Sequence, residues 1–61
     1  MKFIIAYSAK RKNAKRHVYT LHGHVVYFNS IEEAKNHQMY NHPLYNTEIL
    51  TANYKKVEEN K

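Results

Sequence analysis

The stretch Ser30-Ile31-Glu32-Glu33 marks the start of the one helix that the sequence predicts. Its pattern is that of a capping box, in which the serine hydroxyl accepts a hydrogen bond from an N–H of the first helical turn and the glutamate side chain accepts one from the serine N–H. Two glutamates in the first turn also suit the positive end of the helix dipole. We predict a helix from Ile31 to about Asn41, because Pro43 disfavours helical geometry at the residue before it.

Segments with strand character lie on both sides of this helix. Lys2–Tyr7, Arg16–Leu21 and His24–Phe28 are rich in β-branched and aromatic residues. The dipeptide His22-Gly23 between the last two is typical of a tight turn, and short connections favour an antiparallel meander. A last strand, from Thr47 to about Lys56, follows the helix. We therefore predict an α+β fold of order β-β-β-α-β, with the helix packed on one face of an antiparallel sheet.

Length and composition indicate one small folded domain. The chain has 61 residues, of which 43% are hydrophobic, and it contains no cysteine that could form a disulfide. We expect residues 1–57 to form a single basic α+β domain and residues 58–61 to form a frayed C-terminal tail. The longest apolar run, Phe3–Tyr7, is far shorter than the ~20 residues that cross a bilayer, so we expect a cytoplasmic protein with no membrane partner.

The strand pattern places apolar side chains on both faces of the predicted sheet, because side chains alternate along a strand. One face carries Phe3, Ile5, Tyr7, Tyr19, Leu21, Val25 and Tyr27, and the other carries Ile4, Ala6, Val18, Val26 and Phe28. A single helix covers one face, and an exposed apolar patch of that size usually marks an interface. We expect the face with Tyr7, Tyr19 and Tyr27 to stay open and to bind a partner or to form a homodimer. If the helix covers that face instead, the open face is the one with Ile4, Val18 and Val26. The alternative is that strand twist and the C-terminal segment hide it.

Half of the positive charge lies at the junction of the first two predicted strands. The chain has ten Lys and Arg against five acidic residues, and five of the ten are Lys10, Arg11, Lys12, Lys15 and Arg16. Cations at a hairpin tip can reach the phosphates of a nucleic acid, and nearby rings can stack on its bases. The rings that we assign to this surface are Tyr7, His17, Tyr19 and Tyr27. Contact with an acidic protein surface and a merely solvated loop are the alternatives.

The five histidines do not have the spacing of a metal site. His37 and His42 are five positions apart, whereas two ligands on one helix face are four apart. His22 and His24 flank a turn, so their rings need not point the same way. The chain has no Cys or Asp to complete a tetrahedral site, and we expect neither a metal nor a cofactor.

The sequence offers few residues that could form a catalytic site. Ser8 and Ser30 are the only serines, and Ser30 is already assigned to the helix cap. A metal-free ribonuclease needs an acid, a base and a phosphate clamp. The candidates for these roles are His17, His24, Tyr19 and Arg16. Such a set arises readily in any basic strand pair rich in His and Tyr, so we expect a binding protein and not an enzyme.

The order strand, basic turn, strand, strand, helix resembles the AP2-like arm-binding domain of phage and transposon integrases. An aromatic-x-Ser/Thr-x-x-Glu-Ala stretch typically joins the last strand to the helix in that family, and Phe28, Ser30, Glu33 and Ala34 match it. The resemblance implies a three-stranded sheet backed by one helix, with the uncovered sheet face in the DNA major groove.

This resemblance covers about Phe3 to Met39 and has two departures. The turn Lys10-Arg-Lys-Asn13 lacks the glycine of the family's Gly-Lys-Arg turn, and a further predicted strand follows the helix. We expect no catalytic recombinase domain, because 61 residues are too few to contain one. The resemblance therefore implies a shared binding surface without integrase activity.

The composition is also similar in character to that of small early bacteriophage proteins, with no cysteine, six tyrosines and many Asn and Lys. Such proteins, anti-CRISPR proteins among them, commonly occupy a host protein surface or mimic one of its ligands. Our leading expectation is a small non-enzymatic protein that contacts nucleic acid through the basic hairpin and the open aromatic face. The alternative is a phage-encoded inhibitor that binds a host protein with an acidic surface. If the chain is phage-encoded, either would act in the cytoplasm of a bacterial host.

Overall fold

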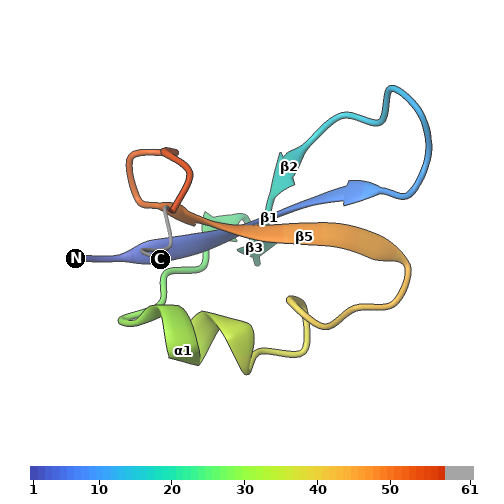
Figure 1. Cartoon of the computed structure of the whole chain (residues 1–61). Helices are drawn as coiled ribbons and strands as arrows, with labels where there is room; N and C mark the ends of the chain where they lie inside the picture. The colour runs from blue at the N-terminus through green and yellow to red at the C-terminus, as the bar shows by residue number, and fades with distance from the viewer. Residues whose placement is uncertain (58–61) are drawn as a thin grey trace.

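The computed structural model describes residues 1–57, and in this part of the chain an antiparallel sheet packs against one short helix (Figure 1). The elements in chain order are β1 (Phe3–Ala9), β2 (His17–Val18), β3 (Thr20–Leu21), β4 (His24–Val25), α1 (Ile31–Lys35) and β5 (Tyr45–Thr51). The predicted α+β class with one helix on the sheet is confirmed. The predicted frayed tail, residues 58–61, lies outside the described residues.

Strand β1 is the centre of the main sheet, whose strand order is β2-β1-β5 with both pairings antiparallel. Strand β5 pairs with β1 over its whole length, from Phe3 opposite Thr51 to Ala9 opposite Tyr45. The other edge of β1 is shared between two segments. Phe28 exchanges two backbone hydrogen bonds with Phe3, at 2.9 and 2.8 Å, and β2 pairs further along the strand.

The predicted strand order is roughly confirmed, but the second and third predicted strands do not continue one three-stranded sheet. The predicted strand Arg16–Leu21 is interrupted at Tyr19, so that β2 stays in the main sheet while β3 leaves it and pairs with β4 in a separate two-stranded sheet. The predicted tight turn between β3 and β4 is confirmed. His22 and Gly23 have φ values of 54° and 80°, the two positive values that a two-residue hairpin turn of matching twist requires.

Helix α1 begins at the predicted residue. Ser30 is its N-cap, and the Ser30 hydroxyl accepts a hydrogen bond from the Glu33 N–H at 3.0 Å, as the capping box predicts. The second bond of the box differs from the prediction, because Glu33 Oε1 accepts from the N–H of Asn29 at 2.8 Å and not from that of Ser30. The Glu33 side chain therefore holds the backbone of Asn29, the residue before the cap.

The helix ends at Lys35 and not near Asn41. Two side chains bind backbone groups that a longer helix would use itself. His37 Nδ1 accepts the Met39 N–H at 3.0 Å, and Asn41 Nδ2 donates to the Lys35 carbonyl at 2.9 Å. Residues 36–42 consequently form a series of short turns.

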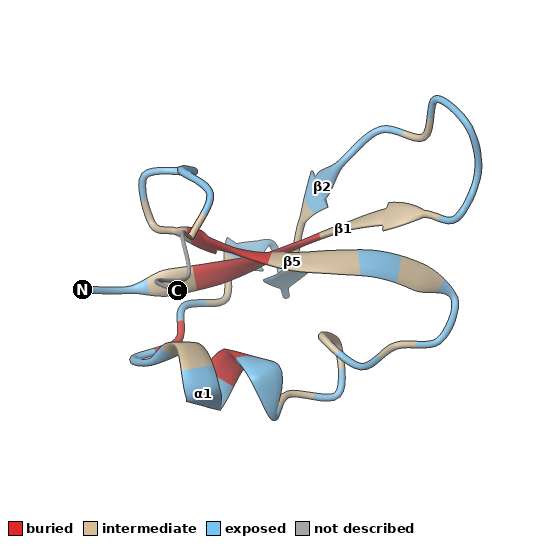
Figure 2. Cartoon of the chain, viewed as in Figure 1, coloured by how far each residue is buried: buried red, intermediate tan, exposed pale blue. Residues whose placement is uncertain are grey.

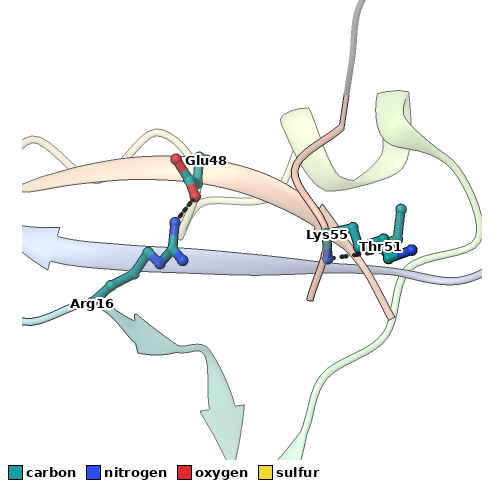
Figure 3. A network of polar contacts seen from close by, with 4 residues as sticks. All are labelled: Arg16, Glu48, Thr51 and Lys55. Carbon is teal, nitrogen blue, oxygen red and sulfur yellow. Dashed lines mark hydrogen bonds and ion pairs between the residues drawn. The ribbon is translucent and has the colours of Figure 1, made fainter. Parts of the chain in front are cut away.

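The predicted last strand begins and ends too late by comparison with the structure. Strand β5 already starts at Tyr45 and ends at Thr51, where the chain turns instead of continuing to Lys56. The Thr51 N–H donates to the Lys55 carbonyl at 2.8 Å, Thr51 Oγ1 accepts from the Lys55 N–H at 3.2 Å, and Tyr54 has a φ of 66° (Figure 3). Lys56 then forms a bridge back to Leu50.

Consecutive residues in the middle of β1 and toward the end of β5 are buried (Figure 2), so side chains on both faces of these strands belong to the core. On the side of α1 the core consists of Ile5, Phe28, Ala34 and Ile49. On the opposite side it consists of Ile4, Ala6 and Leu50, with Val18 and Val25 packed against them. The prediction that one whole face of the sheet is open and aromatic is therefore wrong. Val18 of the edge strand β2 and Val25 of β4 pack against this second cluster, in which Ile4 and Ala6 are fully buried.

The predicted third strand also presents its side chains to faces opposite to those expected. Phe28 and Val26 pack on the side of Ile5, and Val25 packs on the side of Ile4. The bridge between Phe28 and Phe3 sets this register, and a shift of one residue moves every side chain of a strand to the other face. Among the described residues no helix has the length and apolar character needed to cross a membrane.

A candidate site of rings and cations at the hairpin end of the sheet

Four aromatic rings form a continuous row across the end of the sheet that α1 does not cover. Tyr7 on β1 and His17 on β2 are direct cross-strand partners, with ring centroids 5.7 Å apart. Tyr45 on β5 lies diagonally from Tyr7, at 5.0 Å and 65° between ring planes, and His42 follows at 4.8 Å from Tyr45. These separations are in the favourable range for ring pairs. We refer to His17, Tyr7, Tyr45 and His42 as the ring row.

The strand register explains why these rings meet. Residues two apart on a strand share a face, so Tyr7 lies on the same face as Ile5, and Tyr45 lies on the same face as Ile49. Both isoleucines contribute to the core under α1. Burial decreases along β1 from Ile4–Ala6 to Tyr7–Ala9, toward the loop that leads to β2 (Figure 2). The ring row is therefore the accessible continuation of the core face.

An open hollow of about 540 Å³ lies where the ring row meets the basic loop. It is lined by Tyr7, Ala9, Arg11, Asn13, Ala14, Lys15, His17 and Tyr45. Its volume falls within the range of roughly 300–1,000 Å³ that is typical of small-molecule sites. Three rings and two cationic side chains thus converge on a space of the size of one small ligand.

The loop between β1 and β2 reverses the chain without a glycine. The Arg11 N–H donates to the Ala9 carbonyl at 2.9 Å, which bends the chain sharply as it leaves β1. Asn13 then adopts a left-handed conformation with a φ of 66°, which asparagine tolerates better than most side chains. This turn brings Arg11 and Lys15 to the same hollow.

The nine side chains predicted to form one surface are divided by the structure. Tyr7, Arg11, Lys15 and His17 lie together around the hollow. Lys10 and Lys12 are exposed on the same loop but do not line it. The loop therefore presents two cations to the hollow and two more around it.

Arg16 lies outside this group. Its guanidinium reaches across β1 and forms an ion pair with Glu48 on β5 (Figure 3). Glu48 is the register partner of Ala6, on the face opposite to the ring row, and the small side chain of Ala6 leaves room for the crossing. The two side chains are 58% and 33% exposed, and such a pair contributes only about 0–1 kcal/mol to stability. Its effect is to hold the charge of Arg16 away from the hollow.

Tyr19 and Tyr27 are also separated from the hollow. Tyr19 is half-buried against the core on the side of α1, with its ring 5.2 Å from that of His37. It lines a second hollow, of about 600 Å³, whose other lining residues belong to the turns after α1. Tyr27 is 54% exposed beside Phe28, which pairs with the start of β1. The three tyrosines Tyr7, Tyr19 and Tyr27 thus do not form one surface.

Three residues of the site with ring or amide side chains are absent from the sequence-based prediction. Tyr45 and His42 fell in a predicted loop, although Tyr45 begins an alternating run with Thr47 and Ile49 that is typical of a strand. Asn13 is a residue type enriched at turns with positive φ. A search for the start of this alternating run would have found Tyr45.

Comparison with known proteins adds no identification. No family model, no curated protein and no solved structure matches the chain. The resemblance to the AP2-like domain rests on its sequence motif alone. Within residues 1–57 no group of three or more His, Cys, Asp or Glu side chains is arranged to hold a metal ion.

Proposed function

We propose that the protein binds nucleic acid at the hollow between the ring row and the basic loop. The observation that supports this is the convergence of Tyr7, His17 and Tyr45 with Arg11 and Lys15 around one open space. Guanidinium and ammonium groups bind phosphate oxygens, and aromatic side chains stack on bases. Few other abundant ligands present an anion and a flat ring side by side.

The net charge of the chain favours the same partner. The formal charge is +5, and Lys10 and Lys12 add to the positive potential around Arg11 and Lys15. A positive surface of this kind steers a polyanion toward the site and raises its association rate. Arg16 adds little, because Glu48 neutralises it.

The dependence of affinity on salt tests this proposal. If Lys10, Arg11, Lys12 and Lys15 each neutralise one phosphate, the slope of log affinity against log salt is about −2.8 on a single strand and about −3.6 on duplex DNA. Arg11→Gln should make the slope shallower by about 0.7–0.9. Arg16→Gln is the matched control and should leave the slope unchanged.

A gel-retardation assay at low salt gives the simplest decision. Single-stranded and duplex DNA and RNA are each titrated with the purified protein. Retardation of at least one of them, lost in the double variant Arg11→Glu, Lys15→Glu, supports the proposal. Failure to retard any of the four refutes it.

A second candidate function is binding to a host protein with an acidic surface, as in a phage-encoded inhibitor. The observation that favours it lies outside the hollow. Lys10 and Lys12 are exposed on the loop, and Leu44, next to Tyr45, is 69% exposed. An apolar anchor beside cations suits a protein interface. Pull-down from a bacterial lysate, with and without nuclease treatment, separates this candidate from the first.

A further inference from the structure

The shape of the accessible surface restricts the form of nucleic acid that it can bind, if the proposed function is correct. Helix α1 covers the Ile5 end of one sheet face, and on the other face Ile4, Ala6 and Leu50 are buried with Val18 and Val25 packed against them. The hollow of about 540 Å³ is concave and has the size of a site for one small ligand. The sheet therefore offers no long open face that would lie along a duplex.

The lining of the hollow points to an unpaired base. In a duplex the flat faces of the bases are stacked on one another, and only their edges are accessible in the grooves. A tyrosine ring can stack on a base only when that base is unpaired and turned outward. Tyr7 and Tyr45 meet at 65°, so a planar ligand in the hollow can lie flat on one ring and against the edge of the other.

The cations fit the same ligand. Arg11 and Lys15 line the hollow together with the rings, which places positive charge within reach of the phosphates on either side of a nucleotide held there. Arg16, which would extend this charge along the hairpin, is paired with Glu48 on the opposite face. Charge and rings are thus concentrated on one nucleotide instead of being spread along a groove.

We propose that the hollow binds one unpaired nucleotide of a single strand, with its base against Tyr7 and Tyr45 and its two flanking phosphates near Arg11 and Lys15. This inference rests on the proposed nucleic-acid binding and specifies the ligand of the same site. It differs from the geometry that the AP2-like resemblance implies, in which an open sheet face lies in the major groove of duplex DNA.

The test compares three ligands by fluorescence anisotropy at one low salt concentration. The ligands are a labelled oligothymidylate, a duplex of the same length, and an abasic strand of the same length that keeps the phosphates and lacks the bases. We expect the oligothymidylate to bind most tightly, about 5- to 100-fold tighter than the abasic strand, because stacking of one base on an aromatic ring accounts for a factor of this size. Tyr45→Leu should remove most of this difference.

Tyr54→Leu is the matched control, since Tyr54 is 58% exposed and lies in the turn after β5. It should bind all three ligands as the unchanged protein does. A second measurement does not depend on a substitution: thymidine monophosphate should shift the ring NMR signals of Tyr7 and Tyr45 and leave those of Tyr54 in place.

The outcomes separate this inference from the proposal on which it rests. Equal affinity for the duplex, the abasic strand and the oligothymidylate, with a steep salt dependence, would overturn the single-strand inference and leave nucleic-acid binding intact. Absence of binding to all three would overturn both. Preference for the oligothymidylate that survives Tyr45→Leu, without NMR shifts at Tyr7 or Tyr45, would place the base elsewhere and overturn the inference.

Discussion

Replacing Leu50 by alanine tests whether the second face of the sheet is closed. Leu50 is 2% exposed and packs against Ile4 and Ala6, both fully buried. Truncation of a leucine in such a site costs about 2–5 kcal/mol, because the transfer free energy of the lost methyl groups adds to that of the cavity left behind. In a domain of this size each kcal/mol lowers the melting temperature by roughly 4–8 °C.

Leu44→Ala is the matched control, because it is the same substitution in the residue just before β5. Leu44 is 69% exposed, and a surface change of this kind alters stability by no more than about 0.5 kcal/mol. We therefore expect the Leu50 variant to melt at least about 6 °C lower than the Leu44 variant in thermal unfolding followed by circular dichroism.

The total stability of a chain this short is roughly 3–9 kcal/mol, so Leu50→Ala can leave part of the protein unfolded at room temperature. Ile4→Val gives a milder measurement on the same face, with an expected cost of about 0.5–1.5 kcal/mol. Melting curves of Leu50→Ala and Leu44→Ala that coincide would refute the closed face. The second face would then be open, and the argument for a single short binding hollow would fail.

Three further predictions concern the cap, the ion pair and self-association. Ser30→Ala removes the acceptor of the Glu33 N–H and should cost about 1 kcal/mol, or roughly 4–8 °C in melting temperature; an unchanged melting curve would mean that the hydroxyl does not cap the helix. Glu48→Gln breaks the half-exposed pair with Arg16 and should lower the stability of the protein by less than about 1 kcal/mol. The freed charge of Arg16 should raise the affinity for nucleic acid at low salt, and a weaker affinity would contradict the idea that Glu48 neutralises Arg16. The homodimer stays a prediction, although the face proposed for it is closed. Light scattering of the wild type and of Tyr27→Asp at micromolar concentration tests self-association, and a monomeric wild type would refute the homodimer.

Local signals in the sequence predicted those parts of the fold that depend on a few neighbouring residues. The hydroxyl of Ser30 caps the helix, and His22-Gly23 forms the tight turn, because both features act within four residues. The end of the helix could not be predicted in this way. It depends on a hydrogen bond that His37 Nδ1 accepts from the Met39 N–H and on one that Asn41 Nδ2 donates to the Lys35 carbonyl, and these compete with the helix only in this arrangement of turns.

The pairing of β5 with β1 was not predicted, because periodicity within a strand does not say which other strand lies beside it. For the same reason only part of the candidate site was predicted. Tyr7, Arg11, Lys15 and His17 were predicted because they are close together in the sequence. Tyr45 joins them only through the register of β5 on β1, which places it diagonally from Tyr7.

The central position of β1 also has a kinetic consequence. Its longest pairing joins Phe3 to Thr51, so the sheet closes between residues that are far apart in the chain. Non-local pairings of this kind slow folding, because the entropy of closing the loop is lost before the contacts form. Until β5 arrives, the apolar segment Ile4–Ala6 has no partner on that edge. We expect folding to be slow for so small a domain, with the docking of β5 on β1 as the rate-limiting step. If Leu50 is already packed in the transition state of this step, Leu50→Ala will slow refolding more than it accelerates unfolding.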